Sequence, residues 1–326
     1  MTQPFSNPAA QVQMTLSAIA YGDDSWGTGL DAIRKTIDTE LARTDLATKG
    51  DWSRVWGPIQ TKGTDNLMYV AQDGVSKALS VVLRGTVMDL SSWWEDVPTG
   101  MADFDNGQIA GARVSDHFQT ALGELLTTPD PDCGNATVFG FLAGAIRDLT
   151  DPVIYVTGHS QGGGLTPMVL ASAIHTAKTW ATTGAPSLIG YAFAPPTSGN
   201  VAFADWIDAN ATCYLVMNKL DVVPFGYAGM ALVPLESIPC PVPADLIVPI
   251  ELAAGAVRLL GHWKQPASQI GLGPVQLPYT RPVSIRDYVT QVEGQHNHNS
   301  YLYLLGAPQI ANIGSLSPLS SVRQSG

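Results

Sequence analysis

The stretch Pro152-Val-Ile-Tyr-Val-Thr-Gly-His-Ser-Gln-Gly-Gly-Gly-Leu-Thr166 decides how the chain is organised. Its β-branched and aromatic run over 153–156 is typical of a buried strand, and the apolar spacing over 165–178 predicts a helix. Ser160 stands between two glycines at the junction, where a tight turn leaves no room for a Cβ. The stretch therefore predicts a strand–turn–helix that presents Ser160 as a nucleophile at a helix N-terminus. A glycine-rich phosphate loop fits less well, because no lysine follows.

The composition sets limits on the class of protein. The chain has 326 residues, enough for one large α/β domain. The net charge is −11 and no basic cluster is present, which argues against nucleic-acid binding and attraction to an anionic membrane. We expect no transmembrane segment, since no apolar run of about 20 residues occurs. No secretory signal is recognisable in 1–20, so we expect a protein that is cytoplasmic or exported by another route.

The cysteines do not indicate a metal site or a disulfide framework. Cys133, Cys213 and Cys240 are odd in number and widely spaced. Two alternatives are left by the sequence: one disulfide with a spare thiol, or three free thiols that are mostly buried. We expect neither a metal nor a cofactor.

Short apolar strands alternate with helical patterns along the chain. This order predicts a mostly parallel central sheet with helices on both faces. Helices are expected over 9–21, 30–46, 108–126, 138–149, 201–209, 244–260 and 296–305, a hairpin over 67–72 and 77–84, further strands over 188–194 and 213–217, and a loop or hairpin over 271–288. No repeat or linker divides the chain, so a single domain over 1–326 is predicted.

Four stretches occur in a characteristic order. They are Val81 to Thr86 followed by Trp93 to Asp96, then Tyr155 to Leu165, Phe193 to Asp205, and Asn218 to Pro224. Together they resemble the class 3 lipase family, the fungal-type triacylglycerol lipases, and the resemblance implies an α/β-hydrolase fold. It covers about residues 65–225.

The chain departs from the family pattern at several points. Gln161 replaces the usual leucine after the nucleophile, and Thr197-Ser198 replaces an Arg-Val pair. Residues 225–295 form an insertion that matches nothing in the compact fungal enzymes. These departures concern the shape of the substrate pocket rather than the nucleophile.

A serine nucleophile needs a base and an acid that orients the base. In α/β-hydrolases these residues follow the order serine, acid, histidine. Asp221 follows a predicted buried strand, and the resemblance implies that it is the acid. An ordinary turn aspartate is the alternative interpretation.

Two histidines compete for the role of base at the start of the last predicted helix. His298 and Tyr301 have the spacing of the family's His-x-x-Tyr pattern, so we predict His298. His296 is the alternative, and His262 is a weaker candidate. The remaining histidines are expected to be structural: His117, His159 and His175.

The resemblance also implies an oxyanion hole and a lid. The backbone N–H of Gln161 follows the nucleophile, and Thr86 would supply its N–H and hydroxyl. Trp93 and Trp94 would contact substrate from a lid over 87–107, because adjacent tryptophans in a polar loop are costly to expose. The alternative is that both tryptophans belong to the core.

These residues predict a serine hydrolase that cleaves carboxylic esters, a lipase acting on acylglycerols. Its substrate would be an ester or a lipid, and one expected setting of the reaction is an oil–water interface. The alternatives are a short-chain carboxylesterase or phospholipase A1, and a non-catalytic lipase-like interaction protein. The intact Ser-Asp-His order argues against the last. The sequence does not indicate the oligomeric state.

Overall fold

The computed structural model describes residues 3–22, 29–62, 66–85, 100–181, 185–226, 262–273 and 285–310. The described helices are α1 (Asn7–Ile19), α2 (Leu30–Leu41), α4 (Asp116–Thr127), α5 (Val138–Ala145), α6 (Gln161–Trp180), α7 (Val201–Asn210), α9 (Ile285–His296) and α10 (His298–Leu305). The strands are β1 (Trp52–Gln60), β2 (Leu67–Asp73), β3 (Leu79–Arg84), β4 (Met101–Asp103), β5 (Arg113–Ser115), β6 (Val153–His159), β7 (Ser187–Phe193), β8 (Thr212–Asn218) and β9 (Gln269–Leu272).

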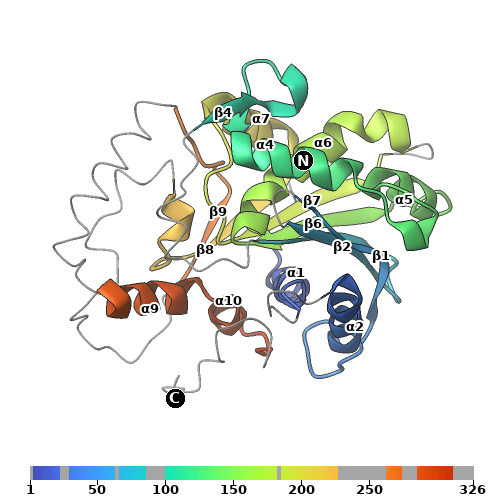
Figure 1. The fold of residues 1–326 in the computed structure, drawn as a ribbon, viewed down its shortest axis with the longest axis horizontal. Coiled ribbons are helices and arrows are strands. Elements are labelled where there is room, and N and C mark those ends of the chain that lie inside the picture. Colours follow the sequence, from blue (N-terminus) through green and yellow to red (C-terminus); the bar gives the residue numbers. More distant parts are fainter. Residues whose placement is uncertain are drawn as a thin grey trace.

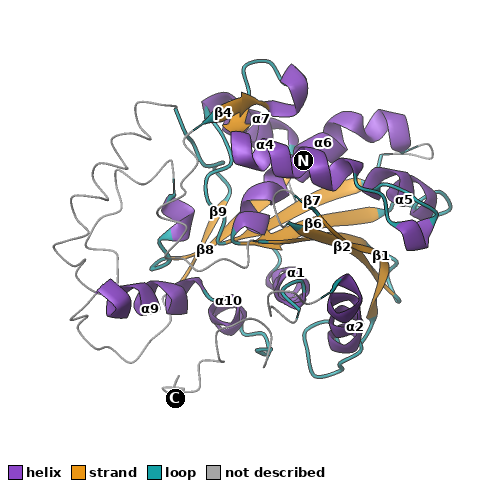
Figure 2. Cartoon of the chain, viewed as in Figure 1, coloured by secondary structure: helices purple, strands orange, loops and turns teal. Residues whose placement is uncertain are grey.

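The central sheet has seven strands in the order β1-β2-β3-β6-β7-β8-β9. β1, β2 and β3 pair antiparallel, whereas β3, β6, β7, β8 and β9 pair parallel. Figure 1 and Figure 2 show α1, α2 and α10 on one face of the sheet and α4, α5, α6 and α7 on the other. The prediction of a mostly parallel sheet with helices on both faces is confirmed.

Two hydrophobic cores lie on the two faces of the sheet because successive strand residues point to opposite sides. Leu79, Val81 and Leu83 of β3 belong to the core under α4, α5 and α6. Val82, between them, belongs to the core under α1 and α2. A strand buried on both faces has no polar alternation, which is why the apolar runs predicted strands correctly.

The hairpin predicted over 67–84 forms, with Leu67 opposite Arg84 and Gln72 opposite Leu79. β1 was not predicted. Gly57 and Pro58 interrupt its pattern, and the register shifts around them. Proline is tolerated there because β1 is an edge strand of the sheet.

Several of the expected helices have other bounds in the structure, and the helices expected over 30–46 and 138–149 end earlier, at Leu41 and Ala145. The helix expected from 108 begins only at Asp116, because Arg113–Ser115 pairs instead with Met101–Asp103 as a small second sheet. The helix over 244–260 lies outside the described residues. The last helix begins at His298 rather than His296.

The segment predicted as a loop or hairpin over 271–288 is partly regular structure. Gln269–Leu272 forms β9 beside β8, and α9 begins at Ile285. β9 depends on contacts that a local pattern does not contain, since it pairs with β8 at the edge of the sheet.

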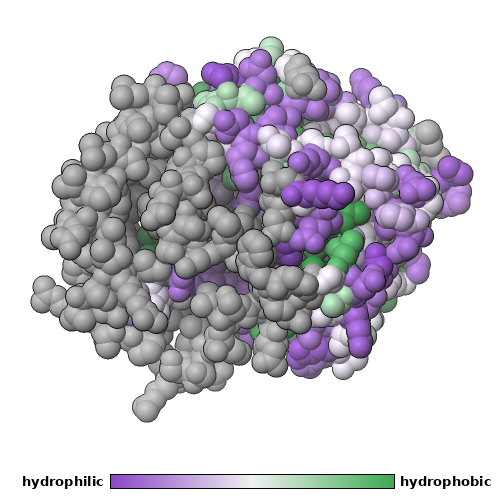
Figure 3. Space-filling model, in the orientation of Figure 1, coloured by the Kyte–Doolittle hydropathy of each residue, from purple (hydrophilic) through white to green (hydrophobic). Residues whose placement is uncertain are grey.

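The described surface has few large apolar side chains. Where Figure 3 colours the described residues, most of the surface is purple or white, and Val75 and Val201 are the large hydrophobic residues exposed among those described. Within the described ranges, no helix combines the length and apolar character needed to cross a membrane. Cys133 and Cys213 carry free thiols, and Cys240 lies outside the described residues.

Candidate active site

Ser160 occupies a sharp turn between β6 and α6. Its φ of 59° and ψ of −127° place the backbone in a region that L-residues rarely adopt. The turn closes because the flanking glycines have no side chains. A Cβ on Gly158 would lie 2.3 Å from the carbonyl oxygen of Gly162, and one on Gly162 would lie 2.4 Å from that of Leu83. The predicted strand–turn–helix is confirmed, with Ser160 partly exposed at its tip.

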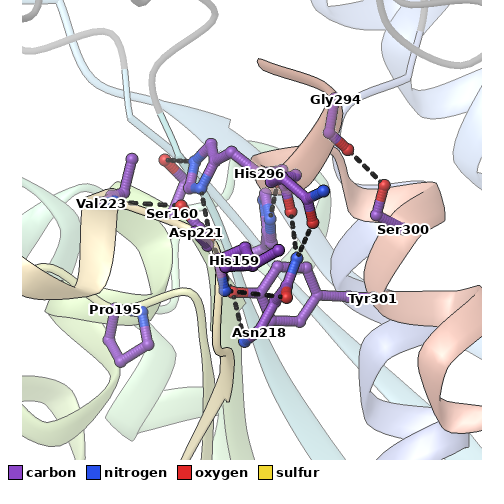
Figure 4. Close-up of polar contacts among 12 residues, drawn as sticks. His159, Ser160, Pro195, Asn218, Asp221, Val223, Gly294, His296, Ser300 and Tyr301 are labelled. Atoms are coloured by element: carbon purple, nitrogen blue, oxygen red, sulfur yellow. Dashed lines mark hydrogen bonds and ion pairs between the residues drawn. The ribbon is translucent and has the colours of Figure 1, made fainter. Parts of the chain in front are cut away.

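His296 lies between Ser160 and Asp221 (Figure 4). Its Nε2 is 2.8 Å from Ser160 Oγ, and its Nδ1 is 2.8 Å from Asp221 Oδ2. With the carboxylate on Nδ1, the neutral ring carries its proton there and leaves Nε2 to accept from the serine hydroxyl. This orientation allows the ring to remove the hydroxyl proton.

Asp221 is fully buried, at 0% exposure, at the carboxyl end of β8. Besides His296, it accepts hydrogen bonds from the backbone N–H of Val223, at 3.0 Å, and from the hydroxyl of Tyr301, at 2.7 Å. Burial and the nearby Asp221 charge raise the pKa of Tyr301 well above its usual value, so its hydroxyl stays protonated and donates. A buried carboxylate is tolerable only with such partners.

The structure contradicts the expectation that His298 lies against Ser160. His298 is buried elsewhere, where its ring stacks on Tyr21 with centroids 5.5 Å apart and an interplanar angle of 20°. Tyr301, the other residue of the His-x-x-Tyr pattern, does reach the site through Asp221. His296 and not His298 is therefore the histidine that contacts Ser160 and Asp221. His262, the weaker candidate, is the first residue of the described segment 262–273.

A corner between α9 and α10 explains the position of His296. α9 ends at His296, and Asn297 caps α10 by accepting a hydrogen bond from the N–H of Asn299 at 2.7 Å. Ser300 Oγ donates to Gly294 O across the corner at 2.5 Å (Figure 4). The predicted single helix over 296–305 is therefore wrong in its first turn, because His296 ends α9 and α10 begins at His298.

Asn218, at the end of β8, fixes the other side of the corner. Its amide Nδ2 donates to the carbonyl oxygen and to the side-chain Oε1 of Gln295, at 2.9 and 2.7 Å. Its backbone N–H donates to Tyr301 Oη at 3.0 Å. Asn218 was part of the fourth quoted stretch, but nothing in its local sequence indicates this positioning role.

His159 supports the backbone of His296. Burial, more than the charges of His296 and His298, lowers the pKa of His159 well below its usual value, so the ring is neutral. Its Nε2–H donates to His296 O at 2.9 Å, which leaves Nδ1 to accept from the hydroxyl of Tyr21 at 3.0 Å. His159 is buried, and the chain just after α1 reaches the site through Tyr21, which no sequence pattern indicated.

The backbone N–H of Gln161 faces the turn that follows β3. Gln161 is the first residue of α6, where an N–H has no acceptor within the helix. A Cβ on Gly85 would lie 3.1 Å from this nitrogen and 2.9 Å from both His159 O and Tyr21 Oη. Thr86, the second predicted oxyanion donor, follows Gly85 directly but lies outside the described residues, as do Trp93 and Trp94.

Gly85→Ala is expected to lower kcat by about 10²-fold, the loss typical of displacing one oxyanion donor. The added methyl group meets the His159 carbonyl in β6, the Tyr21 hydroxyl and the Gln161 nitrogen at the start of α6, so it displaces the backbone that carries the donor. Steady-state kinetics on a soluble ester checks the loss. Gly123→Ala in α4 is the matched control, because its Cβ meets nothing within 4 Å. Wild-type kcat in Gly85→Ala would contradict this placement of the donor.

Within the described ranges, no group of three or more His, Cys, Asp and Glu side chains is arranged to hold a metal. The groups brought together are instead a partly exposed hydroxyl, an imidazole and a buried carboxylate in series. The hydroxyl and the carboxylate lie beyond the carboxyl ends of β6 and β8, and the imidazole lies at the end of α9. Fold and site thus define the class as an α/β-hydrolase with the side-chain arrangement of a serine hydrolase.

Comparison with known families identifies the class more closely. Residues 80–228 match the family model for "Lipase (class 3)". Over these residues the chain is similar to the class 3 lipases, and this match supports a carboxylic ester hydrolase. The curated proteins compared with the chain include no match.

Solved structures of lipases share the fold. The M37 lipase superimposes with a TM-score of 0.76 at 22% identity, covering 93% of this chain and 94% of that one. A triacylglycerol lipase from Penicillium expansum gives a TM-score of 0.53 at 17% identity over 82% and 80%. The lipase from Rhizopus microsporus var. chinensis gives 0.51 at 21% identity over 69% and 70%. At these identities the likeness concerns the α/β-hydrolase fold, which confirms the predicted fold class.

Proposed function

We propose that the protein is a lipase that hydrolyses acylglycerol esters with Ser160 as nucleophile, His296 as base and Asp221 as the acid that orients the base. The observation that carries the proposal is the continuous contact from Ser160 Oγ through both nitrogens of His296 to Asp221, with 2.8 Å at each step. A non-catalytic lipase-like protein has no need to keep this geometry around a buried carboxylate.

In the first half of the reaction, Ser160 Oγ attacks the ester carbonyl while His296 Nε2 takes the hydroxyl proton. The Asp221 carboxylate stabilises the imidazolium that forms. The negative charge on the former carbonyl oxygen is stabilised by the N–H of Gln161 and, by resemblance, by Thr86. His296 then returns the proton to the leaving alcohol, and the acyl group stays on Ser160. Water repeats the sequence in the second half and releases the carboxylic acid.

We further propose that residues 1–326 form one domain. The two ends of the described chain meet, because Gln11 of α1 donates to the carbonyl oxygen of Leu305 at the end of α10 at 2.7 Å, and Asn7 donates to the same oxygen at 3.3 Å. Both helices cover the same face of the sheet.

A comparison of substrates tests the proposed substrate class. Purified protein is given triacylglycerols and p-nitrophenyl esters of increasing acyl length, and a diacyl phospholipid in parallel. The proposal predicts the highest kcat/KM on long-chain acylglycerols. Activity confined to short soluble esters would make the protein a carboxylesterase, and a preference for the phospholipid sn-1 ester would make it a phospholipase A1.

Interfacial activation is a separate prediction, based on Trp93 and Trp94 in the sequence. Exposing these side chains to water costs about 25 cal/mol per Å² of apolar surface. At an oil surface that cost disappears. The hydrolysis rate is therefore expected to rise steeply once a poorly soluble ester passes its solubility limit.

The double variant Trp93→Ser/Trp94→Ser should weaken that rise and leave hydrolysis of a short soluble ester nearly unchanged. The control is the same titration with an ester that stays dissolved throughout. A hyperbolic rate curve through the solubility limit in the wild type rules out interfacial gating and leaves the tryptophans as core residues.

A further inference from the structure

The side chain of Gln161 is anchored to a neighbouring helix. Gln161 follows Ser160 directly, and its side chain is buried, with the residue only 7% exposed. Its Nε2 lies 2.8 Å from Nε2 of His117 on α4. The other amide atom, Oε1, has no hydrogen-bond partner among the described residues. Among the described residues, the side-chain amide of Gln161 therefore makes its hydrogen bond to His117.

The direction of this hydrogen bond follows from the chemistry of the two groups. An amide nitrogen can only donate, so Nε2 of His117 accepts and the ring carries its proton on Nδ1. Burial lowers the pKa of His117, while the charges of Asp116 and Glu124 on the same helix act in the opposite direction and are smaller. The neutral ring is the form that can accept.

α4 is firmly seated against the first turn of α6. A Cβ on Gly164 would lie 2.7 Å from the ring of Phe118, the residue after His117, so the two helices are in close contact there. The N–H of Ser115, just before α4, donates to Ser198 O at 3.0 Å, and Ser198 Oγ donates to Gly164 O at 2.6 Å. His117 therefore holds the Gln161 amide from a fixed position.

We propose that His117 is a positioning residue, which holds the Gln161 side chain and thereby keeps the backbone N–H of Gln161 aligned with the oxyanion. The inference rests on the proposed function, since it concerns the same site. A buried amide needs a hydrogen-bond partner, because an unmade hydrogen bond costs more than a made one contributes. Gln161 places such an amide directly after the nucleophile, and His117 supplies its acceptor.

His117→Leu is expected to lower kcat about tenfold, as the loss of a buried hydrogen bond does, with KM within about twofold. Only kcat should respond, because the donor acts on charge that develops in the transition state. His117→Gln is the conservative variant, whose carbonyl oxygen can accept the same hydrogen bond. It should recover kcat to within about threefold of wild type.

The double variant His117→Leu/Gln161→Leu supplies the sharper test. If the two side chains act as a pair, leucine at both positions should recover most of the kcat that His117→Leu loses, since neither polar group is then left unpaired. Unchanged kcat in His117→Leu overturns the proposal. So does a double variant whose loss is the product of the single losses, or a fall in kcat that His117→Gln does not recover.

Labelling with a fluorophosphonate separates this inference from the proposed function. Wild type and His117→Leu should both be labelled at Ser160, since the nucleophile and its base are intact in each. Absence of label and of ester hydrolysis in the wild type refutes the proposed function itself. Label and hydrolysis in the wild type together with full kcat in His117→Leu refute the positioning role alone.

Discussion

Ser160→Ala is expected to abolish ester hydrolysis, with a loss of about 10⁴-fold or more in kcat. Alanine has the same Cβ as serine, so it occupies the turn at φ 59° with no new contact. It lacks the hydroxyl that lies 2.8 Å from His296 Nε2, and without it no acyl-enzyme can form. Steady-state hydrolysis of a soluble p-nitrophenyl ester measures the loss, and thermal unfolding checks that the fold persists.

Fluorophosphonate labelling accompanies this measurement. The wild type should be labelled once and Ser160→Ala should not. Ser187→Ala is the matched control, because Ser187 is an exposed serine at the start of the adjacent β7, and it should keep both label and activity. If Ser160→Ala hydrolyses the ester within about tenfold of the wild-type rate, far above the expected residual rate, the nucleophile lies elsewhere.

His296→Ala is expected to lower kcat by about 10²- to 10⁴-fold, the range for loss of a general acid–base group. His296 is the ring that contacts Ser160 Oγ and Asp221 together. His298→Ala is the natural comparison, since it removes the same side chain two residues away. It should affect kcat little and lower the unfolding temperature instead, because His298 is a buried ring stacked on Tyr21.

The two variants are compared by kcat on a soluble ester and by thermal unfolding. The reverse result, a loss of several orders of magnitude in His298→Ala alone, would mean that the working enzyme adopts a different corner between α9 and α10. Full activity in both variants would move the base to another histidine and remove the basis of the proposed mechanism.

Local sequence was sufficient to predict the strand–turn–helix around Ser160. Its glycines are required by backbone atoms only a few residues away or on the next strand, so the pattern carries its own geometry. The same holds for the buried strands. Their apolar runs are the direct consequence of burial on both faces of a parallel sheet, which also predicted the layers of helices around it. Asp221 lies three residues beyond such a strand, but its predicted role as the acid came from the resemblance to the class 3 lipases.

Local sequence patterns could not identify which histidine is the base. The His-x-x-Tyr spacing favoured His298, but the choice between His296 and His298 depends on where α9 ends and α10 begins. That corner is set by Asn218 on β8 and His159 on β6, which hydrogen-bond to Gln295 and to the carbonyl oxygen of His296. These partners are 77 and 137 residues away.

The sequence by itself thus predicted the turn at Ser160 and the sheet, because the physical requirements of each lie within a few residues, whereas the prediction of Asp221 as the acid came from the family resemblance. The tertiary structure alone decided which histidine completes the site, that Tyr301 binds Asp221, that Tyr21 supports His159, and that His117 holds Gln161. Each of these is a hydrogen bond between side chains or backbone brought together by packing. Residue spacing along one element contains no information about such partners on another.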